Sequence, residues 1–136
     1  MKAPTIVFAD DEPALSEALR SALEARGYTC IAVTDMTQAW KLLNTRPVAV
    51  LVTDIMMPPG SDFAGLDSSV TGYNLVGMVR RSFPSVSVVC LSVIADTKKI
   101  NELKTQNVLY LRKGETSLAT AWKLIESRVT GKISFY

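Results

Sequence analysis

Histidine is absent from this chain of 136 residues. Without imidazole, Ser-His-Asp catalysis, Cys-His catalysis and histidine-rich metal sites are all excluded. The chain also lacks any apolar run near the roughly 20 residues that a membrane helix needs. Its first apolar segment is too short for a signal peptide and is followed at once by acidic residues. We therefore expect a soluble, cytoplasmic protein that makes no contact with a membrane.

Cysteine is nearly absent as well, with Cys30 and Cys90 the only two. Both fall inside apolar runs, which favours buried core thiols over a redox pair and is compatible with a reducing compartment. Charged residues are few, at 21%, whereas hydrophobic residues make up 48%. That balance is typical of a globular domain and not of a disordered chain. The length predicts a single domain over residues 1–136, with no effector domain.

What the chain does have is a regular alternation of short β-rich runs and longer helical periods. This pattern predicts βαβ units around a parallel sheet. The first, third and fourth runs are apolar nearly throughout, as in strands that are covered on both faces. A polar segment, 96–106, has only Ile100 and Leu103 to anchor it and predicts a weak fourth helix. The expected strands are residues 5–9, 29–33, 48–53, 86–92 and 108–111.

Five such units without a second domain predict an α/β architecture, a flavodoxin-like, doubly wound (βα)5 sandwich. With right-handed crossovers and helices on both faces, the natural strand order is 2-1-3-4-5. This order separates the second and fourth strands, which carry Cys30 and Cys90, by three strand spacings, about 14 Å. A disulfide needs Cα atoms within about 7 Å, so we expect two free thiols.

In an open α/β sheet the ligand site lies beyond the carboxyl ends of the strands. The side chains there are Asp10, Asp11 and Glu12 after the first strand, Asp54 after the third, Ser92 ending the fourth and Lys113 past the fifth. Converging carboxylates repel one another unless a cation neutralises them. An all-oxygen ligand set suits a hard ion such as Mg2+.

Taken one at a time, these residues have simpler explanations. The acidic run before Pro13 is also typical of a helix N-terminus, where carboxylates are favoured. Asp54 is compatible with a turn, Ser92 with a strand-end hydroxyl bonded to backbone, and Lys113 with a solvated loop. Their joint placement at one edge of the sheet is what favours a site.

The same residues resemble the receiver domain of two-component response regulators, over nearly the whole chain. Four segments carry the resemblance in the correct order and at the correct strand ends. They are Val7-Phe8-Ala9-Asp10-Asp11-Glu12-Pro13, Val52-Thr53-Asp54-Ile55-Met56-Met57-Pro58, Leu91-Ser92 and Tyr110-Leu111-Arg112-Lys113.

The resemblance implies a phosphoacceptor module of a phosphorelay and not an enzyme with a turnover of its own. Asp54 is then the nucleophile that takes a phosphoryl group from the phosphohistidine of a histidine kinase or histidine phosphotransfer protein. The implied Mg2+ ligands are Asp10, partly through water, Asp11, Asp54 and the backbone carbonyl of Met56. Lys113 and Ser92 bind the phosphoryl group, and the ring of Tyr110 rotates inward.

The resemblance also implies where the signal leaves the domain. A downstream protein would bind the surface of the fourth helix, fifth strand and fifth helix. A homodimer is left open. Direct nucleic-acid binding is not expected, because the chain shows no helix-turn-helix and no basic patch with interleaved aromatics.

Two other functions stay open at this point. One is a pseudo-receiver that binds protein without being phosphorylated. The other is a small phosphohydrolase with Asp10 as nucleophile and Glu12 as acid, which gives Asp54 no role. Phosphorylation by ATP is not expected, because Gly72 and Gly77 have P-loop spacing but are followed by Met78 and not by Gly-Lys.

The chain departs from the family pattern in three places. Residues 59–71 form a loop roughly ten residues longer than usual, either a lid or partner contact or a mobile excursion. Gly114 stands where the family has a proline in a cis peptide, so this loop is expected to be trans or more mobile. Val93 stands where many receivers have Ala or Gly, and Met56 and Ile94 flank the site as apolar groups, which predicts restricted water access and a long-lived aspartyl phosphate.

Charge is distributed unevenly along the chain. Residues 1–77 carry 5 basic and 9 acidic side chains, whereas residues 78–136 carry 10 and 4. The basic half is compatible with a solvated face or with an acidic partner surface. Its basic residues include Arg80, Arg81, Lys98, Lys99, Lys104 and Arg112.

Overall fold

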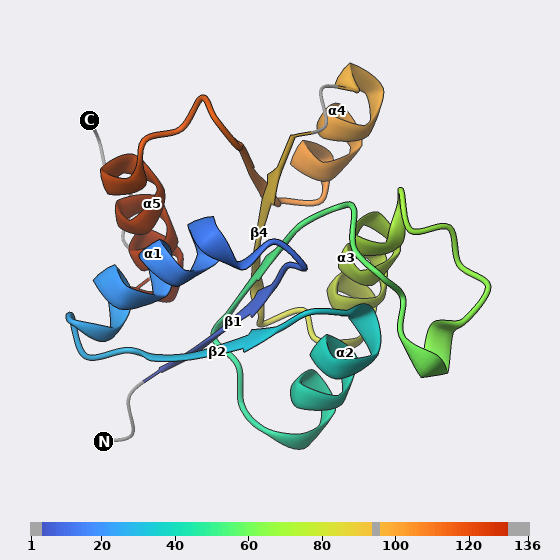
Figure 1. Cartoon of the computed structure of the whole chain (residues 1–136), viewed down its shortest axis with the longest axis horizontal. Helices are drawn as coiled ribbons and strands as arrows, with labels where there is room; N and C mark the ends of the chain where they lie inside the picture. Colours follow the sequence, from blue (N-terminus) through green and yellow to red (C-terminus); the bar gives the residue numbers. More distant parts are fainter. Residues whose placement is uncertain (1–3, 94–95, 131–136) are drawn as a thin grey trace.

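A computed structural model of the protein describes residues 4–93 and 96–130 (Figure 1). Strands and helices alternate along it as the sequence predicts. The elements are β1 Thr5–Ala9, α1 Pro13–Glu24, β2 Thr29–Val33, α2 Met36–Thr45, β3 Val50–Thr53, the 3-10 turn η1 Ser61–Phe63, α3 Thr71–Ser82, β4 Ser87–Ser92, α4 Thr97–Thr105, β5 Leu109–Arg112 and α5 Leu118–Thr130. Within the described residues, no helix has the length and apolar character needed to cross a membrane.

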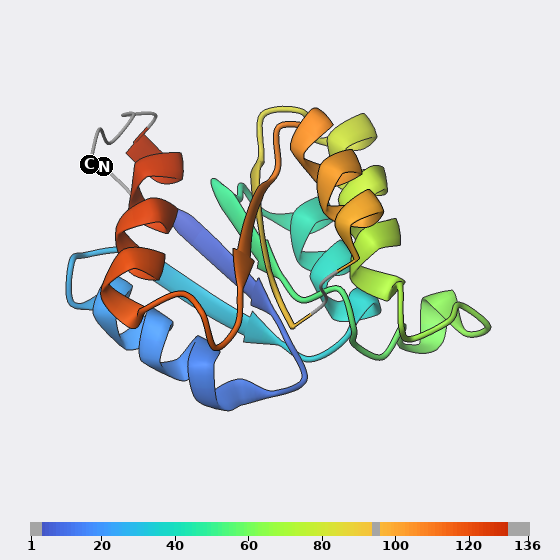
Figure 2. The same cartoon turned by 90° about the horizontal axis from the view of Figure 1, so that it is seen from above.

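The five strands form one parallel sheet in the order β2-β1-β3-β4-β5, which confirms the predicted flavodoxin-like topology. Figures 1 and 2 show α1 and α5 on one face of the sheet and α2, α3 and α4 on the other. Alternate residues of β1 point to the two faces: Val7 and Ala9 lie in one core cluster, Ile6 and Phe8 in the other. The sheet therefore has a hydrophobic layer on each side, as a doubly wound fold requires.

Register brings the carboxyl ends of the central strands together. Ala9 of β1 pairs with Thr53 of β3, and Thr53 pairs with Cys90 of β4. The residues that follow, Asp10 and Asp54, therefore leave the sheet at the same level. This alignment is what builds the site described below.

Four strand boundaries differ from the sequence prediction, namely the starts of β3, β4 and β5 and the end of β5. At β4 and β5, the N–H of the expected first residue bonds outside the sheet. The Val86 N–H donates to Phe83 in a turn (3.0 Å), so β4 begins at Ser87. The Val108 N–H donates to Leu103 (3.1 Å), so β5 begins one residue later than expected and continues to Arg112. Residue 48 precedes the ladder, whose first bond runs from the Ala49 N–H to Thr5 (2.8 Å), and β3 begins at Val50.

Helix α4 is as weakly anchored as its sequence predicts. Asp96 caps it by accepting the N–H groups of Lys98 and Lys99 (3.0 and 3.2 Å). Leu103 is its only fully buried residue among those described, and Ile100 is half-buried. With so little apolar burial, this helix is the least firmly held element of its layer.

The two cysteines are free thiols, as expected. Cys90 is fully buried, but the prediction that both are core thiols is wrong for Cys30, which is half-buried because β2 is an edge strand. Burial raises the pKa of Cys30 to about 11 and also raises the pKa of Cys90. Neither thiol is a reactive one at neutral pH.

Candidate functional site

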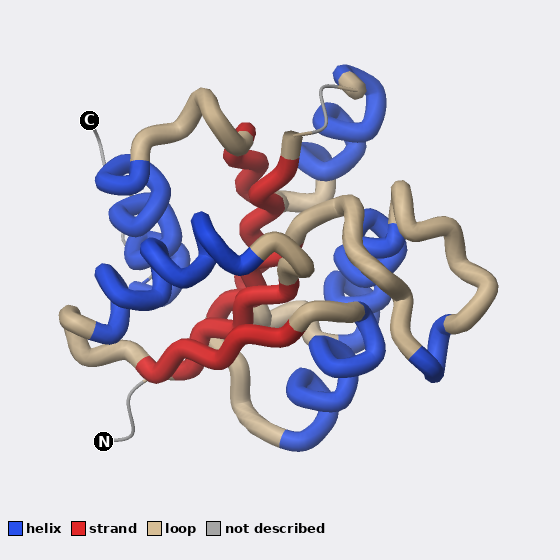
Figure 3. Tube along the Cα trace, in the orientation of Figure 1, coloured by secondary structure: helices blue, strands red, loops and turns tan. Residues whose placement is uncertain are grey.

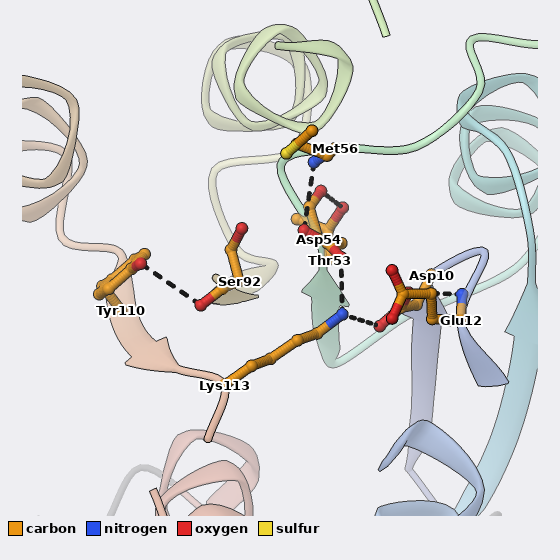
Figure 4. A network of polar contacts seen from close by, with 8 residues as sticks. All are labelled: Asp10, Glu12, Thr53, Asp54, Met56, Ser92, Tyr110 and Lys113. Atoms are coloured by element: carbon orange, nitrogen blue, oxygen red, sulfur yellow. Dashed lines mark hydrogen bonds and ion pairs between the residues drawn. The ribbon is translucent and has the colours of Figure 1, made fainter. Parts of the chain in front are cut away.

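The carboxyl edge of the sheet gathers the side chains that the sequence singled out (Figure 4). Asp10 follows β1, Asp54 follows β3, Ser92 ends β4 and Lys113 follows β5. All but Lys113 are buried residues, at 7%, 5% and 0% exposure in the same order. Buried polar groups need partners, so their contacts define what this edge does.

Lys113 joins the two buried carboxylates. Its Nζ lies 2.6 Å from Oδ2 of Asp54 and 2.8 Å from Oδ2 of Asp10. The backbone supports this reach, because the Lys113 N–H donates to the Ser92 carbonyl (2.9 Å). Gly114, at φ +83°, turns the chain immediately afterwards, and no cis peptide bond occurs among the described residues. Glycine in place of the family's proline thus leaves the ammonium within reach of Asp54.

Burial and hydrogen bonding shift the pKa values of Asp10 and Lys113. Burial raises the pKa of Asp10, and the hydrogen bond from Lys113 offsets this only in part. Burial alone would lower the pKa of Lys113, but its bonds to the two carboxylates outweigh it and the net shift is upward. The lysine therefore stays charged and serves as the fixed cation of the site.

Three carboxylates face this single ammonium. Asp10, Asp11 and Asp54 each offer an oxygen, and these atoms lie within 4.8 Å of one another. Asp11 is exposed, whereas the other two are buried. A second cation would relieve the remaining negative charge, and a hard, oxygen-preferring ion such as Mg2+ fits this donor set.

The backbone around Asp54 is held from several sides. The Met56 N–H donates to Asp54 Oδ1 (3.1 Å), and the Thr53 hydroxyl donates to the Asp54 carbonyl (2.9 Å). On the far side, the Gly72 N–H donates to Ile55 (2.8 Å) as α3 begins. A Cβ at Gly72 would lie 1.7 Å from the Asp54 carbonyl oxygen. Glycine is required here because the first turn of α3 crosses directly over the backbone of Asp54 and Ile55.

The roles of Thr53 and Gly72 could not be predicted from the sequence. In the sequence, Gly72 stands out only by its P-loop spacing from Gly77, and the structure places both glycines inside α3, not in a phosphate-binding loop. A glycine in the first turn of a helix only weakly predicts that another backbone segment passes close to it. The structure shows that segment to be the backbone of Asp54.

Ser92 and Tyr110 lie together on the β5 side of the site (Figure 4). Ser92 is fully buried, and Tyr110 is half-buried. The Tyr110 hydroxyl donates to the Ser92 carbonyl in a long hydrogen bond of 3.4 Å, and its ring packs against a core cluster. Burial raises the pKa of Tyr110, so its hydroxyl remains protonated at neutral pH.

A pocket of about 380 Å³ opens at this edge, and the long loop forms one of its walls. Met56 and Val93 border it and are 45% and 59% exposed, and the third apolar residue predicted to flank the site, Ile94, lies outside the described residues. The pocket lining is Asp11, Glu12, Asp54, Met56, Met57, Pro58, Ser68, Ser69, Val93 and Lys113.

The loop between β3 and α3 is attached to α2 through Thr37. The Thr37 hydroxyl donates to the Pro59 carbonyl and accepts the Asp62 N–H, both at 3.0 Å. The Met57 N–H closes the loop by donating to Ser68 (3.2 Å). The outer part of the loop extends beyond α2 and α3 (Figure 3). The backbone N–H groups of Met36 and Thr37 also donate to the Pro58 and Pro59 carbonyls (3.1 and 3.0 Å), so the loop is docked on α2 and lines the pocket from one side.

Comparison with known proteins agrees with this geometry. Residues 6–118 match the family described as "Response regulator receiver domain". Over 71 residues the chain is 38% identical to "Response regulator GtcR" of Aneurinibacillus migulanus, a match that covers 52% of this chain and 29% of that protein. The chain thus matches well under half the length of this curated relative.

Solved structures share the fold at low sequence identity. The signal receiver domain of an HD domain-containing protein from Pseudomonas fluorescens Pf-5 has a TM-score of 0.79 and 21% identity, covering 97% of this chain and 90% of that one. A Francisella response regulator receiver domain has a TM-score of 0.76 and 24% identity, covering 96% and 99%. With the family match over residues 6–118, these similarities show that the chain belongs to the response regulator receiver domain family.

Proposed function

We propose that this protein is a phosphorylation-switched module of a two-component phosphorelay, with Asp54 as its phosphoacceptor. The observation that carries the proposal is the position of the Lys113 ammonium, 2.6 Å from Oδ2 of Asp54. Phosphoryl transfer depends mainly on positioning and on neutralising charge. A buried carboxylate beside a fixed cation, open to a pocket, suits that reaction.

In the proposed reaction, a carboxylate oxygen of Asp54 attacks the phosphorus of a phosphohistidine. The new O–P bond forms as the N–P bond of the donor breaks, and the imidazole leaves with its electron pair and takes up a proton. Lys113 moves its hydrogen bond from the carboxylate to an oxygen of the transferred group. The side chain of Ser92 donates a second hydrogen bond to that group.

Mg2+ is the proposed cofactor. Asp10, in part through water, Asp11, Asp54 and the Met56 carbonyl would hold it. When bound, the ion neutralises charge on the phosphoryl group. The residues of this chain orient the carboxylate: the Met56 N–H holds Oδ1, which keeps Oδ2 toward Lys113.

The proposed output is a shift between two packings of the β4–β5 edge. A phosphoryl group adds a charge of about −1.5 to −2, which draws the Ser92 side chain inward and leaves room for the Tyr110 ring. The weak anchoring of α4 supports this proposal, because little packing opposes its movement. The proposed partners are a histidine kinase or histidine phosphotransfer protein as donor, and a downstream protein at the α4-β5-α5 face.

The test is phosphorylation by phosphoramidate in the presence of Mg2+, followed by intact mass and by the fluorescence of Trp40 and Trp122. We expect an adduct of about 80 Da that Asp54→Asn abolishes and that EDTA prevents. A protein that folds but forms no adduct would instead be a pseudo-receiver. Catalytic phosphate release that survives Asp54→Asn would favour the phosphohydrolase with Asp10 and Glu12.

A further inference from the structure

The two glycines of α3 differ in how much space surrounds them. Position 72 has no room for a side chain because the Asp54 carbonyl lies directly beside it. Gly77 lies in the middle of the same helix, and a Cβ there would meet only the Nη1 of Arg81, at 3.4 Å, which is the end of a flexible side chain. Glycine is less favourable than alanine in a helix interior. Nothing within the described residues requires glycine at position 77.

Gly77 does line a groove of about 400 Å³ where α3 meets the end of α4. Figure 2 shows these two helices next to each other, and the Tyr73 hydroxyl on α3 donates to Glu102 on α4. The missing side chain opens the floor of the groove. Its lining consists of Tyr73, Asn74, Gly77, Arg80, Arg81 and Gln106.

The groove is positively charged. Arg80 and Arg81 both line it, and neither forms an ion pair with any described residue. Arg80 is oriented by one hydrogen bond, from its Nη1 to the Val86 carbonyl (3.1 Å), and a guanidinium has five N–H donors in all. The nearby acidic residue, Glu102, already accepts a hydrogen bond from Tyr73. The arginines are therefore available to an external anion.

We infer that the α3–α4 groove is a docking site for an acidic protein segment, in which Arg80 and Arg81 bind carboxylates while the chain passes over Gly77. Guanidinium forks match carboxylates in geometry and charge. Asn74 and Gln106 can bond the backbone of an extended segment. Tyr73 is the single aromatic residue of the lining, which argues against stacked nucleotide bases. This site goes beyond the proposed function and does not depend on phosphorylation of Asp54.

The test uses a fluorescein-labelled hexaglutamate peptide as probe, with affinity from anisotropy and location from amide NMR shifts in 15N-labelled protein. Arg81→Glu reverses one charge of the groove, and Gly77→Leu fills its floor with a good helix former. Lys41→Glu is the control: the residue is exposed on α2, forms no ion pair within the described residues, and undergoes the same change of charge.

We expect hexaglutamate to shift the amides of residues 73–81 and 106. Arg81→Glu and Gly77→Leu should each weaken binding about tenfold, whereas Lys41→Glu should change it little. Urea unfolding checks that both groove variants remain folded. The inference is overturned if the wild-type chain does not bind the peptide, if Lys41→Glu weakens binding as much as Arg81→Glu, or if Gly77→Leu binds as well as wild type. Tighter, Arg81-dependent binding of a DNA duplex would also overturn it.

Discussion

The Nζ of Lys113 lies 2.6 Å from Oδ2 of Asp54, and this contact ties the end of β5 to the end of β3 across the intervening strand β4. The same nitrogen lies 2.8 Å from Asp10 at the end of β1. One ammonium thus links three strands at their carboxyl ends. The link concerns stability as well as chemistry, because the two carboxylates are buried and would otherwise repel each other.

Lys113→Gln should destabilise the protein when no divalent ion is present. Removing the cation leaves buried carboxylates without charge compensation, at a cost of about 1–3 kcal/mol in the free energy of unfolding. Urea titrations in EDTA and in Mg2+ measure this, and Mg2+ should recover more stability in the variant than in wild type. Lys41→Gln, on an exposed part of α2, is the control. Equal unfolding free energies for wild type and Lys113→Gln in EDTA would contradict the prediction.

Gly72→Ala should destabilise the protein, whereas Gly77→Ala in the same helix should not. A Cβ at position 72 would sit 1.7 Å from the Asp54 carbonyl oxygen, so α3 must shift at a cost of about 1–3 kcal/mol. At position 77 the added methyl meets only the Nη1 of Arg81, at 3.4 Å, the end of a flexible side chain, and alanine should raise stability by about 0.5–1 kcal/mol. Circular dichroism during urea unfolding gives both values. Similar effects at the two positions would show that the crossing of α3 over Asp54 is not as close as described.

Thr37→Val should loosen the long loop. Valine keeps the shape of the side chain but leaves the Asp62 N–H and the Pro59 carbonyl without their hydroxyl partner, a loss of about 1 kcal/mol. Amide hydrogen exchange should show faster exchange at Asp62. Thr45→Val is the matched control, because the Thr45 hydroxyl bonds only within α2. Unchanged exchange at Asp62 would mean that the loop is held by its other attachments.

Removing residues 61–69 tests what the loop does. If it is a partial lid or a partner contact, the shortened chain should differ from wild type in phosphorylation rate or in partner affinity. Unchanged values for both would remove that hypothesis and leave the loop as a docked surface excursion.

The aspartyl phosphate should be long-lived. Met56 and Val93 border the pocket as apolar side chains and offer no group that would orient an attacking water. The measurement is the loss of the mass adduct after the phosphodonor is removed, with Met56→Gln expected to hydrolyse faster. A half-life of seconds for wild type would contradict this prediction.

Much of this molecule follows from local pattern. The central strands are apolar on both faces, and the parallel order places Asp10, Asp54, Ser92 and Lys113 at one edge, so their convergence was predictable from the sequence. The starts of β1 and β2 were predicted correctly, but those of β4 and β5 were not, because Val86 and Val108 have strand-like side chains while their N–H groups bond to a turn and a helix end. The pattern of apolar side chains does not indicate which acceptor a backbone N–H group bonds.

The remaining features depend on contacts between segments distant in sequence. Thr37 is unremarkable within α2 until the loop returns to it 22 residues later. Gly72 and Gly77 look alike in sequence, and only the path of the Asp54 backbone separates them. The length of the loop over residues 59–71 could be predicted from the sequence. Its attachment to α2 could not, since a loop of this length can close in many conformations.

Acid should weaken the contact between the turn after α1, which carries Arg26, and Glu126 of α5. The Arg26 guanidinium, which hydrogen-bonds Glu126 at 2.5 and 2.8 Å and lies over Trp122, holds the pKa of that carboxyl below its usual range. A carboxyl with a lowered folded-state pKa contributes stability above its unfolded pKa, about 4.3, and loses it as the pH falls through the folded value. Glu126→Gln should therefore be slightly less stable than wild type at pH 7, and the difference should vanish in acid below the folded-state pKa of Glu126.

Unfolding followed by Trp122 fluorescence at both pH values measures this difference in stability, with Glu17→Gln on the exposed side of α1 as control. A difference that persists unchanged in acid would assign the effect to packing and not to the charge of Glu126.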